Sequence, residues 1–159
     1  MQIKLKKMLA SLFLLATFGM FINVSAPSQA QAGTARFGTL VKDGNFDFKV
    51  LGMSCGIHTA NRFATASGQY CRVQIWVRNH ANKKNMFAVS GQKAVDAKGR
   101  EYDADTAADI YSGNPLSLKY VNPGISITGF LWFDMPRGDV PKYIELHDSF
   151  WSSGARVYR

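Results

Sequence analysis

The 159-residue sequence has no run of five or more like charges and no internal repeat, and it contains only two cysteines and three histidines. The missing charge runs and repeats exclude a disordered acidic or basic tail and a collagen-like chain. Hydrophobic residues make up 47% and charged residues 19% of the chain, which is typical of a globular protein. At this length we expect one domain that can bury a core without a metal or several disulfides.

Long apolar stretches are equally scarce, since Met8–Val24 is the only one in the sequence. Three lysines precede it, and a polar tail ends in the small-x-small pattern Ala30-Gln31-Ala32. This order predicts a secretory signal peptide over residues 1–32 and a domain over residues 33–159. The alternative is an uncleaved membrane anchor, because the stretch approaches the roughly 20 residues that span a bilayer. The Ala-x-Ala site favours cleavage, after which no membrane span remains.

The chain is basic, with 19 Lys and Arg against 11 Asp and Glu and a formal charge of +8. Removal of the signal peptide would leave 16 basic and 11 acidic residues, a net charge of +5. Proteins that bind nucleic acid usually cluster their basic residues, whereas Lys83-Lys84 is the only adjacent basic pair in this remainder. We therefore expect no nucleic-acid partner, and attraction to an anionic cell envelope instead. The predicted location is secreted or extracytoplasmic.

Both cysteines, Cys55 and Cys71, lie in the predicted domain. An even number of cysteines in an exported chain indicates a disulfide. A metal or redox pair would instead call for C-x-x-C spacing or closely spaced histidines, which the sequence lacks. A bridge between the two is expected to add about 3 kcal/mol to stability by the loop-entropy model.

The pattern after residue 33 is one of strands and turns. Residues 69–79 alternate most clearly, with Cys71, Val73, Ile75 and Val77 on one face. Further strands are predicted over 35–41, 46–54, 86–89, 93–96, 100–102, 125–135, 143–148 and 155–158, and a loop over 55–68. Residues 105–111 could form one or two helical turns with Asp105 as the N-cap. About eight short strands without strand–helix alternation predict an all-β, antiparallel β-sandwich.

Five motifs together carry a resemblance: FDFKVLGMSCG (46–56), GQYCRVQIWVRN (68–79), DAKGREYDADTAADIY (96–111), NPGISITGFLWFDMP (122–136) and YIELHDSFWSSG (143–154). In this order the chain resembles secreted bacterial immunoglobulin-like domains of unknown function, related in fold to the mycobacterial immunoprotective extracellular antigen. The resemblance implies an exported immunoglobulin-like sandwich with Cys55 bridged to Cys71. It implies no reaction, because that family has no catalytic motif to carry over.

A catalytic reading depends mainly on His147-Asp148-Ser149, which contains the residue types of a hydrolase triad. Neighbours in a strand point to opposite faces, so adjacent His and Asp cannot orient each other as a triad requires. No G-x-S-x-G motif is present. The other histidines, His58 and His80, lie in predicted loops without a ligand at metal spacing. We therefore predict neither an enzyme nor a cofactor.

The acidic residues Asp96, Asp103, Asp105 and Asp109 are candidates for a calcium site. The last three fall within seven positions, but the stretch lacks the glycine and the closing glutamate of an EF-hand loop. Turn and helix-cap roles explain each Asp individually. No metal site is predicted, and calcium binding stays a weaker alternative.

One face of two predicted strands is both aromatic and basic. In 69–79 the polar side carries Tyr70, Arg72, Trp76 and Arg78, and in 125–135 Trp132 lies on the polar side. If both strands share a sheet, these residues form a candidate binding face, since Trp, Tyr and Arg are frequent binding anchors. Alternatively, the 104–121 connector or the 149–154 turn packs over these rings.

The preferred hypothesis is an exported, non-catalytic binding module for an extracellular protein, a glycan or an anionic envelope polymer. A structural or protective extracellular protein without a defined ligand is the main alternative. Binding of calcium is the weaker one.

Overall fold

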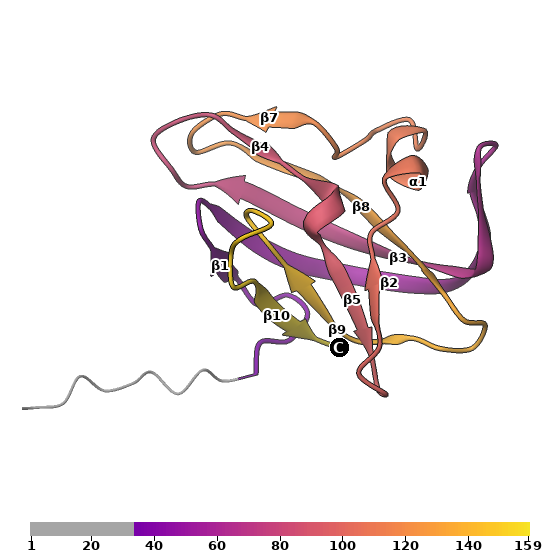
Figure 1. Cartoon of the computed structure of the whole chain (residues 1–159). Helices are drawn as coiled ribbons and strands as arrows, with labels where there is room; N and C mark the ends of the chain where they lie inside the picture. The colour runs from indigo at the N-terminus through magenta and orange to yellow at the C-terminus, as the bar shows by residue number, and fades with distance from the viewer. Residues whose placement is uncertain (1–33) are drawn as a thin grey trace, which may run out of the picture. The chain divides into compact units, whose positions relative to one another are not determined.

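The strands of the domain pair into two antiparallel sheets and a short ribbon (Figure 1). The computed structural model describes residues 34–159, so the predicted signal peptide over 1–32 lies outside the described residues. The first sheet contains, in spatial order, β1 (Val41–Asp43), β2 (Phe46–Asn61), β3 (Ala64–Asn79) and β8 (Ser126–Met135). The second contains β10 (Ala155–Tyr158), β9 (Pro141–Leu146), β5 (Lys93–Asp96) and β6 (Glu101–Asp103).

The remaining elements are short. A two-stranded ribbon is formed by β4 (Asn85–Phe87) and β7 (Lys119–Val121). A 3-10 turn, η1 (Val89–Gly91), follows β4, and α1 (Thr106–Ile110) follows β6. No helix within residues 34–159 has the length and apolarity that a membrane crossing would need.

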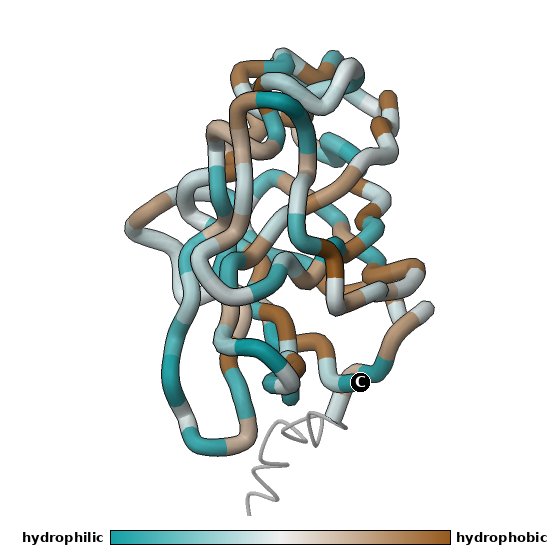
Figure 2. The backbone as a smooth tube through the Cα atoms, turned by 90° about the vertical axis from the view of Figure 1, so that its right-hand side faces the viewer, coloured by the Kyte–Doolittle hydropathy of each residue, from teal (hydrophilic) through white to brown (hydrophobic). Residues whose placement is uncertain are grey.

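The core lies between the two sheets and follows the strand alternation. Along β3 the inward positions Cys71, Val73, Ile75 and Val77 are fully buried, while their neighbours face outward. Figure 2 shows the resulting interleaving of apolar and polar residues along the chain. Three buried rings meet in this core, those of Phe46, Phe48 and Phe87, with centroids 6.0 to 6.2 Å apart. The predicted all-β sandwich is confirmed.

The predicted disulfide is present as well. Cys55 of β2 is bonded to Cys71 of β3, so the bridge joins neighbouring strands of one sheet. Cys71 is fully buried and Cys55 packs against the same core.

Two predicted boundaries are wrong. Residues 55–68 are not a loop, because β2 and β3 continue as a hairpin that turns at Arg62 and Phe63. Register shifts interrupt this hairpin repeatedly after Val50, which removes the regular alternation by which a strand is recognised. The predicted strand over 35–41 is also wrong, since regular pairing begins only at Val41, with β1.

The connector after α1 is fixed to the sandwich by one leucine. Leu116 is fully buried, and its backbone N–H donates to the carboxylate of Asp109. A Cβ added to Gly129 of β8 would lie 2.6 to 3.0 Å from three side-chain carbons of Leu116. Glycine at this strand position therefore leaves the space that the leucine occupies, and the connector contributes β7, a strand absent from the sequence prediction.

Candidate functional site

The outer face of the first sheet holds the residues predicted as a binding face. β3 pairs with β8, and Arg72 lies directly opposite Trp132. β3 also pairs with β2, and Trp76 lies directly opposite Lys49. The condition set by the sequence, that both aromatic strands share one sheet, is met.

Tyr70 and Trp132 are nevertheless not exposed, and the predicted face must be corrected there. Their exposed fractions are 1% and 5%, because Ala108 of α1 packs with them in a small second core. The Tyr70 hydroxyl donates to the Asp105 carboxylate at 2.6 Å, and burial together with this carboxylate raises the pKa of Tyr70. The 104–121 connector thus covers these two rings, which strand alternation could not reveal.

The other predicted residues remain partly exposed and lie among cation–π pairs. The Arg72 guanidinium is 4.5 Å from the ring centroid of Phe130. Trp76 is flanked by Lys49 at 5.4 Å and by Arg78 at 5.8 Å. We call these five residues, Lys49, Arg72, Trp76, Arg78 and Phe130, the basic-aromatic face. Lys49 was missed as a site residue, although its alternation with Phe48 and Val50 already placed it outward.

One carboxylate interrupts this face, and it is buried. Asp47 is 0% exposed and accepts a hydrogen bond from Arg78 at 2.9 Å. His80 lies 2.9 Å and Lys42 3.7 Å from the same carboxylate. Burial would raise the pKa of Asp47, but the hydrogen bond from Arg78 and the electrostatic effects of His80, Arg78 and Lys42 outweigh it and hold that pKa low. Arg78 is therefore committed to Asp47.

The face is also slightly hollowed. A shallow depression of about 180 Å³ lies between β2, β3 and β8. Its lining residues are Gly52, Met53, Ser54, Arg72, Gln74 and Phe130.

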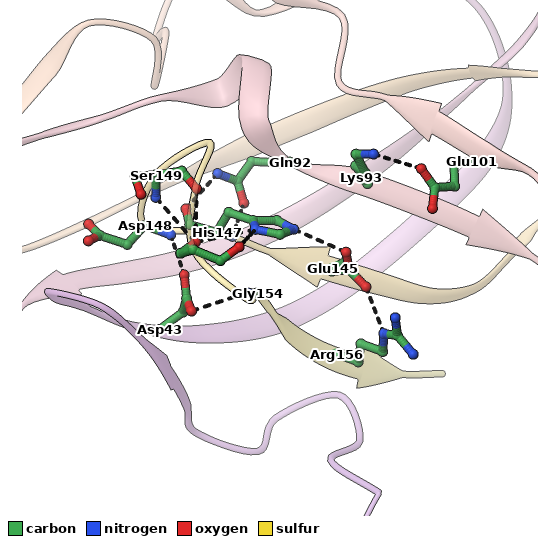
Figure 3. A network of polar contacts seen from close by, with 11 residues as sticks. Asp43, Gln92, Lys93, Glu101, Glu145, His147, Asp148, Ser149, Gly154 and Arg156 are labelled. Atoms are coloured by element: carbon green, nitrogen blue, oxygen red, sulfur yellow. Dashed lines mark hydrogen bonds and ion pairs between the residues drawn. The ribbon is translucent and has the colours of Figure 1, made fainter.

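Around His147 the structure assembles polar contacts that the sequence did not predict (Figure 3). The imidazole Nε2 is 3.1 Å from Glu145, and Nδ1 is 3.3 Å from the Ser152 hydroxyl. Glu145 is also bound by Arg156 at 2.6 Å, and these partners hold the pKa of Glu145 low against the opposing effect of burial. Serine, histidine and glutamate thus meet, but not through the adjacent residues 147–149.

These contacts stabilise the 149–154 turn and do not activate Ser152 as a nucleophile. The Ser152 hydroxyl donates to the backbone oxygen of Ser149 at 2.9 Å, so its proton is directed away from the imidazole. The backbone of His147 is held on both sides by the Gln92 amide, whose oxygen accepts from the N–H and whose nitrogen donates to the carbonyl. To act as a general base, the His147 imidazole would have to accept a hydrogen bond from the hydroxyl of the nucleophile, and the Ser152 hydroxyl donates elsewhere.

The 149–154 turn carries two solvent-exposed aromatic rings. Phe150 and Trp151 are 81% and 90% exposed, with ring centroids 5.1 Å apart. Below them the Asp43 carboxylate accepts from the backbone N–H of Asp148 at 2.7 Å and of Gly154 at 3.2 Å. The 149–154 turn therefore does not cover the sheet, contrary to one of the two covers considered from the sequence.

The acidic residues considered for calcium are separated by their local roles. Asp96 accepts from two backbone N–H groups of its own turn, and Asp105 caps α1 through the N–H of Ala108. Asp109 accepts from two N–H groups of the connector. Within residues 34–159 no three His, Cys, Asp or Glu side chains gather as a metal site would require. His58, expected in a loop, is exposed on β2.

Comparison with known proteins agrees with the resemblance inferred from the motifs. The family model described as "Domain of unknown function (DUF4352)" matches residues 35–156. A search of curated proteins found no match. Among solved structures, the secreted protein MPT63 from Mycobacterium tuberculosis is similar with a TM-score of 0.57 and 17% identity over 74% of this chain and 91% of that chain. The yjhA protein from Bacillus subtilis is similar with a TM-score of 0.61 and 12% identity over 78% and 98% of the two chains.

At these identities the likeness shows a shared fold alone. The coverage shows in addition that both neighbours consist of little beyond this sandwich.

Proposed function

The chain belongs to the DUF4352 family, a domain of unknown function, and from this premise we propose that it is an exported, non-catalytic binding module of the cell envelope. The ligand we propose is an anionic envelope polymer, held on the basic-aromatic face. Three features support export: the signal-peptide pattern over 1–32, the Cys55–Cys71 disulfide, and the fold shared with a secreted protein.

The observation that supports the proposal most directly is that two cationic side chains on this face, Arg72 and Lys49, have no carboxylate partner in the part of the chain that the structure describes. Within residues 34–159, no carboxylate pairs with the Arg72 guanidinium or the Lys49 ammonium, although both are held over aromatic rings. The aromatic ring restricts the conformations of the cationic side chain above it but leaves its charge unpaired. The side chain therefore loses less conformational entropy when it binds an anion. Asp47, two residues from Lys49 on β2, is already hydrogen-bonded to Arg78.

The shape of the face favours an extended ligand. The depression of about 180 Å³ is smaller than the roughly 300 Å³ at which small-molecule sites begin. Lys49, Trp76 and Thr128 follow one another across β2, β3 and β8, and adjacent strands lie about 4.8 Å apart. A linear polyanion lying across the strands can therefore meet a cation, a ring and a hydroxyl in succession.

The test is a binding titration of residues 33–159 with poly(glycerol phosphate), using uncharged dextran as the neutral counterpart. We expect binding to the polyanion that weakens with salt, because exposed charges are screened. Lys49→Gln with Arg72→Gln should weaken it about tenfold or more, and Trp76→Ala should also weaken it. The matched control, Lys98→Gln with Lys142→Gln, removes the same charge elsewhere and should bind within about twofold of the wild type.

Equal affinities of the Lys49/Arg72 variant and its control would overturn the proposal, since binding would then depend only on the net charge of the protein. A protein that binds no polyanion would favour the alternative, a structural extracellular protein without a ligand. Preferential binding to dextran would favour a neutral glycan.

A further inference from the structure

The β4–β7 ribbon has one buried and one exposed apolar face. Met86 lies directly opposite Tyr120, and these side chains are 42% and 64% exposed. The inward residues Phe87 and Val121 are 0% and 1% exposed. The ribbon is therefore anchored by one set of apolar side chains and presents a second set to solvent.

Leu118, directly before β7, is a further exposed apolar residue, and its backbone is strained. Its φ is +61°, the only positive value for a non-glycine residue among residues 34–159. Its side chain is 70% exposed. A left-handed backbone is unfavourable for a leucine, and an exposed leucine gains nothing from core packing in return. Strain of this kind is found where a side chain serves a contact outside the fold.

Cations surround these apolar side chains without acidic neighbours in the sequence. The Lys84 ammonium lies 5.1 Å from the ring centroid of Tyr120. Lys83 is its exposed neighbour, and Lys119 donates to the neutral amide of Asn114. Neither 81–95 nor 110–133, the two stretches that contain the ribbon strands, includes an Asp or Glu.

A small apolar hollow lies beside the ribbon. Its volume is about 180 Å³, and Met86, Ile110 and Leu118 line it. Ala88 and Ser90 also line a second, smaller hollow, whose other lining residues include Phe150. The first hollow is smaller than a typical small-molecule site but open to an inserted hydrocarbon group.

We propose that this outward surface, consisting of Lys83, Lys84, Met86, Leu118 and Tyr120, docks the domain on an anionic phospholipid bilayer. Exposed apolar side chains with a ring that has one polar end match the boundary between hydrocarbon and headgroups. Lysines beside them match the negative headgroups. The contact is peripheral and involves no crossing of the bilayer. It uses none of the residues of the basic-aromatic face, so it stands or falls separately from polymer binding.

The test is flotation of residues 33–159 with vesicles of phosphatidylglycerol and phosphatidylcholine, against vesicles of phosphatidylcholine alone. We expect binding to the anionic vesicles that salt weakens. Met86→Ser with Leu118→Asn should lower the affinity about tenfold or more, because two apolar side chains are withheld from the bilayer. Lys83→Gln with Lys84→Gln should reduce the preference for anionic vesicles.

Leu118→Asn is informative on its own because asparagine tolerates a left-handed backbone. Its unfolding temperature should equal or exceed that of the wild type while vesicle binding falls. Two matched controls should bind as the wild type does: Leu40→Ser with Val140→Ser for exposed apolar residues, and Lys98→Gln with Lys142→Gln for charge.

Unchanged vesicle binding by the Met86/Leu118 variant overturns the proposal, as does equal binding to neutral vesicles. A wild-type dimer that the same variant dissociates in sedimentation also overturns it, since the surface would then bind a second copy. The Lys49/Arg72 variant should retain vesicle binding, which separates this result from the outcome for the polymer.

Discussion

Replacing Gly129 by alanine is expected to destabilise the sandwich through a single methyl group. The new Cβ would lie 2.6 Å from Cγ of Leu116 and 2.7 and 3.0 Å from its two methyl carbons. Leu116 is fully buried and cannot swing into solvent. Overpacking of this kind costs about 1–3 kcal/mol, which equilibrium unfolding in urea should show as a lower midpoint at an unchanged slope.

A double-mutant cycle isolates the contact. Leu116→Ala alone should cost about 2–5 kcal/mol, because it leaves a cavity between the connector and β8. In the double variant the methyl group at position 129 enters that cavity and meets no leucine. The combined loss should therefore be smaller than the sum of the two single losses by more than about 1 kcal/mol. Additive losses would refute the inference that Gly129 is required by Leu116.

Three further predictions concern other parts of the domain. Burial opposes ionisation of Asp96, but hydrogen bonds from Arg100, from the backbone of Lys98 and from the Tyr102 hydroxyl lower its pKa from 3.8 to about 2. The stability that Asp96 contributes is therefore present above pH 4 and is lost as the pH falls towards 2, and Asp96→Asn should flatten the melting temperature over that interval. Replacing Cys55 and Cys71 by alanine should lower the free energy of unfolding by about 3 kcal/mol, and an unchanged urea midpoint would contradict this. Because Trp151 is 90% exposed, Trp76 partly exposed and Trp132 only 5% exposed, Trp151→Phe should reduce the long-wavelength, acrylamide-quenched part of the fluorescence most, and Trp132→Phe should leave it in place.

Strand alternation predicted the sandwich because burial between two sheets imposes a period of two. Ile75 and its inward neighbours on β3 follow that period without interruption. The strand predicted over 69–79 is therefore present, although β3 begins earlier than predicted, at Ala64. The distal half of the β2–β3 hairpin was missed, since the register shifts after Val50 break the period while the backbone pairing continues.

The candidate site was predicted only in part, for a different reason. Alternation assigns Tyr70 and Arg72 to the same outer face, yet α1 covers the first and leaves the second partly exposed. That cover comes from a segment more than 30 residues away, so no local pattern could reveal it. The pairing of Met86 with Tyr120 is of the same kind, because it joins two strands of three residues each from distant parts of the chain.

The contacts between Ala35–Phe37 and Tyr158 bear on how the domain would fold under the proposed export. The N–H of Phe37 donates to the carbonyl of Tyr158, whose own N–H donates to Ala35, and Arg36 reaches the carbonyl of Arg159, 123 positions away. A chain that emerges amino-terminus first on the far side of a membrane cannot form these bonds until its carboxyl-terminal strand follows. Residues 35–37 would therefore stay unpaired, and the sandwich would close only after β10 had emerged.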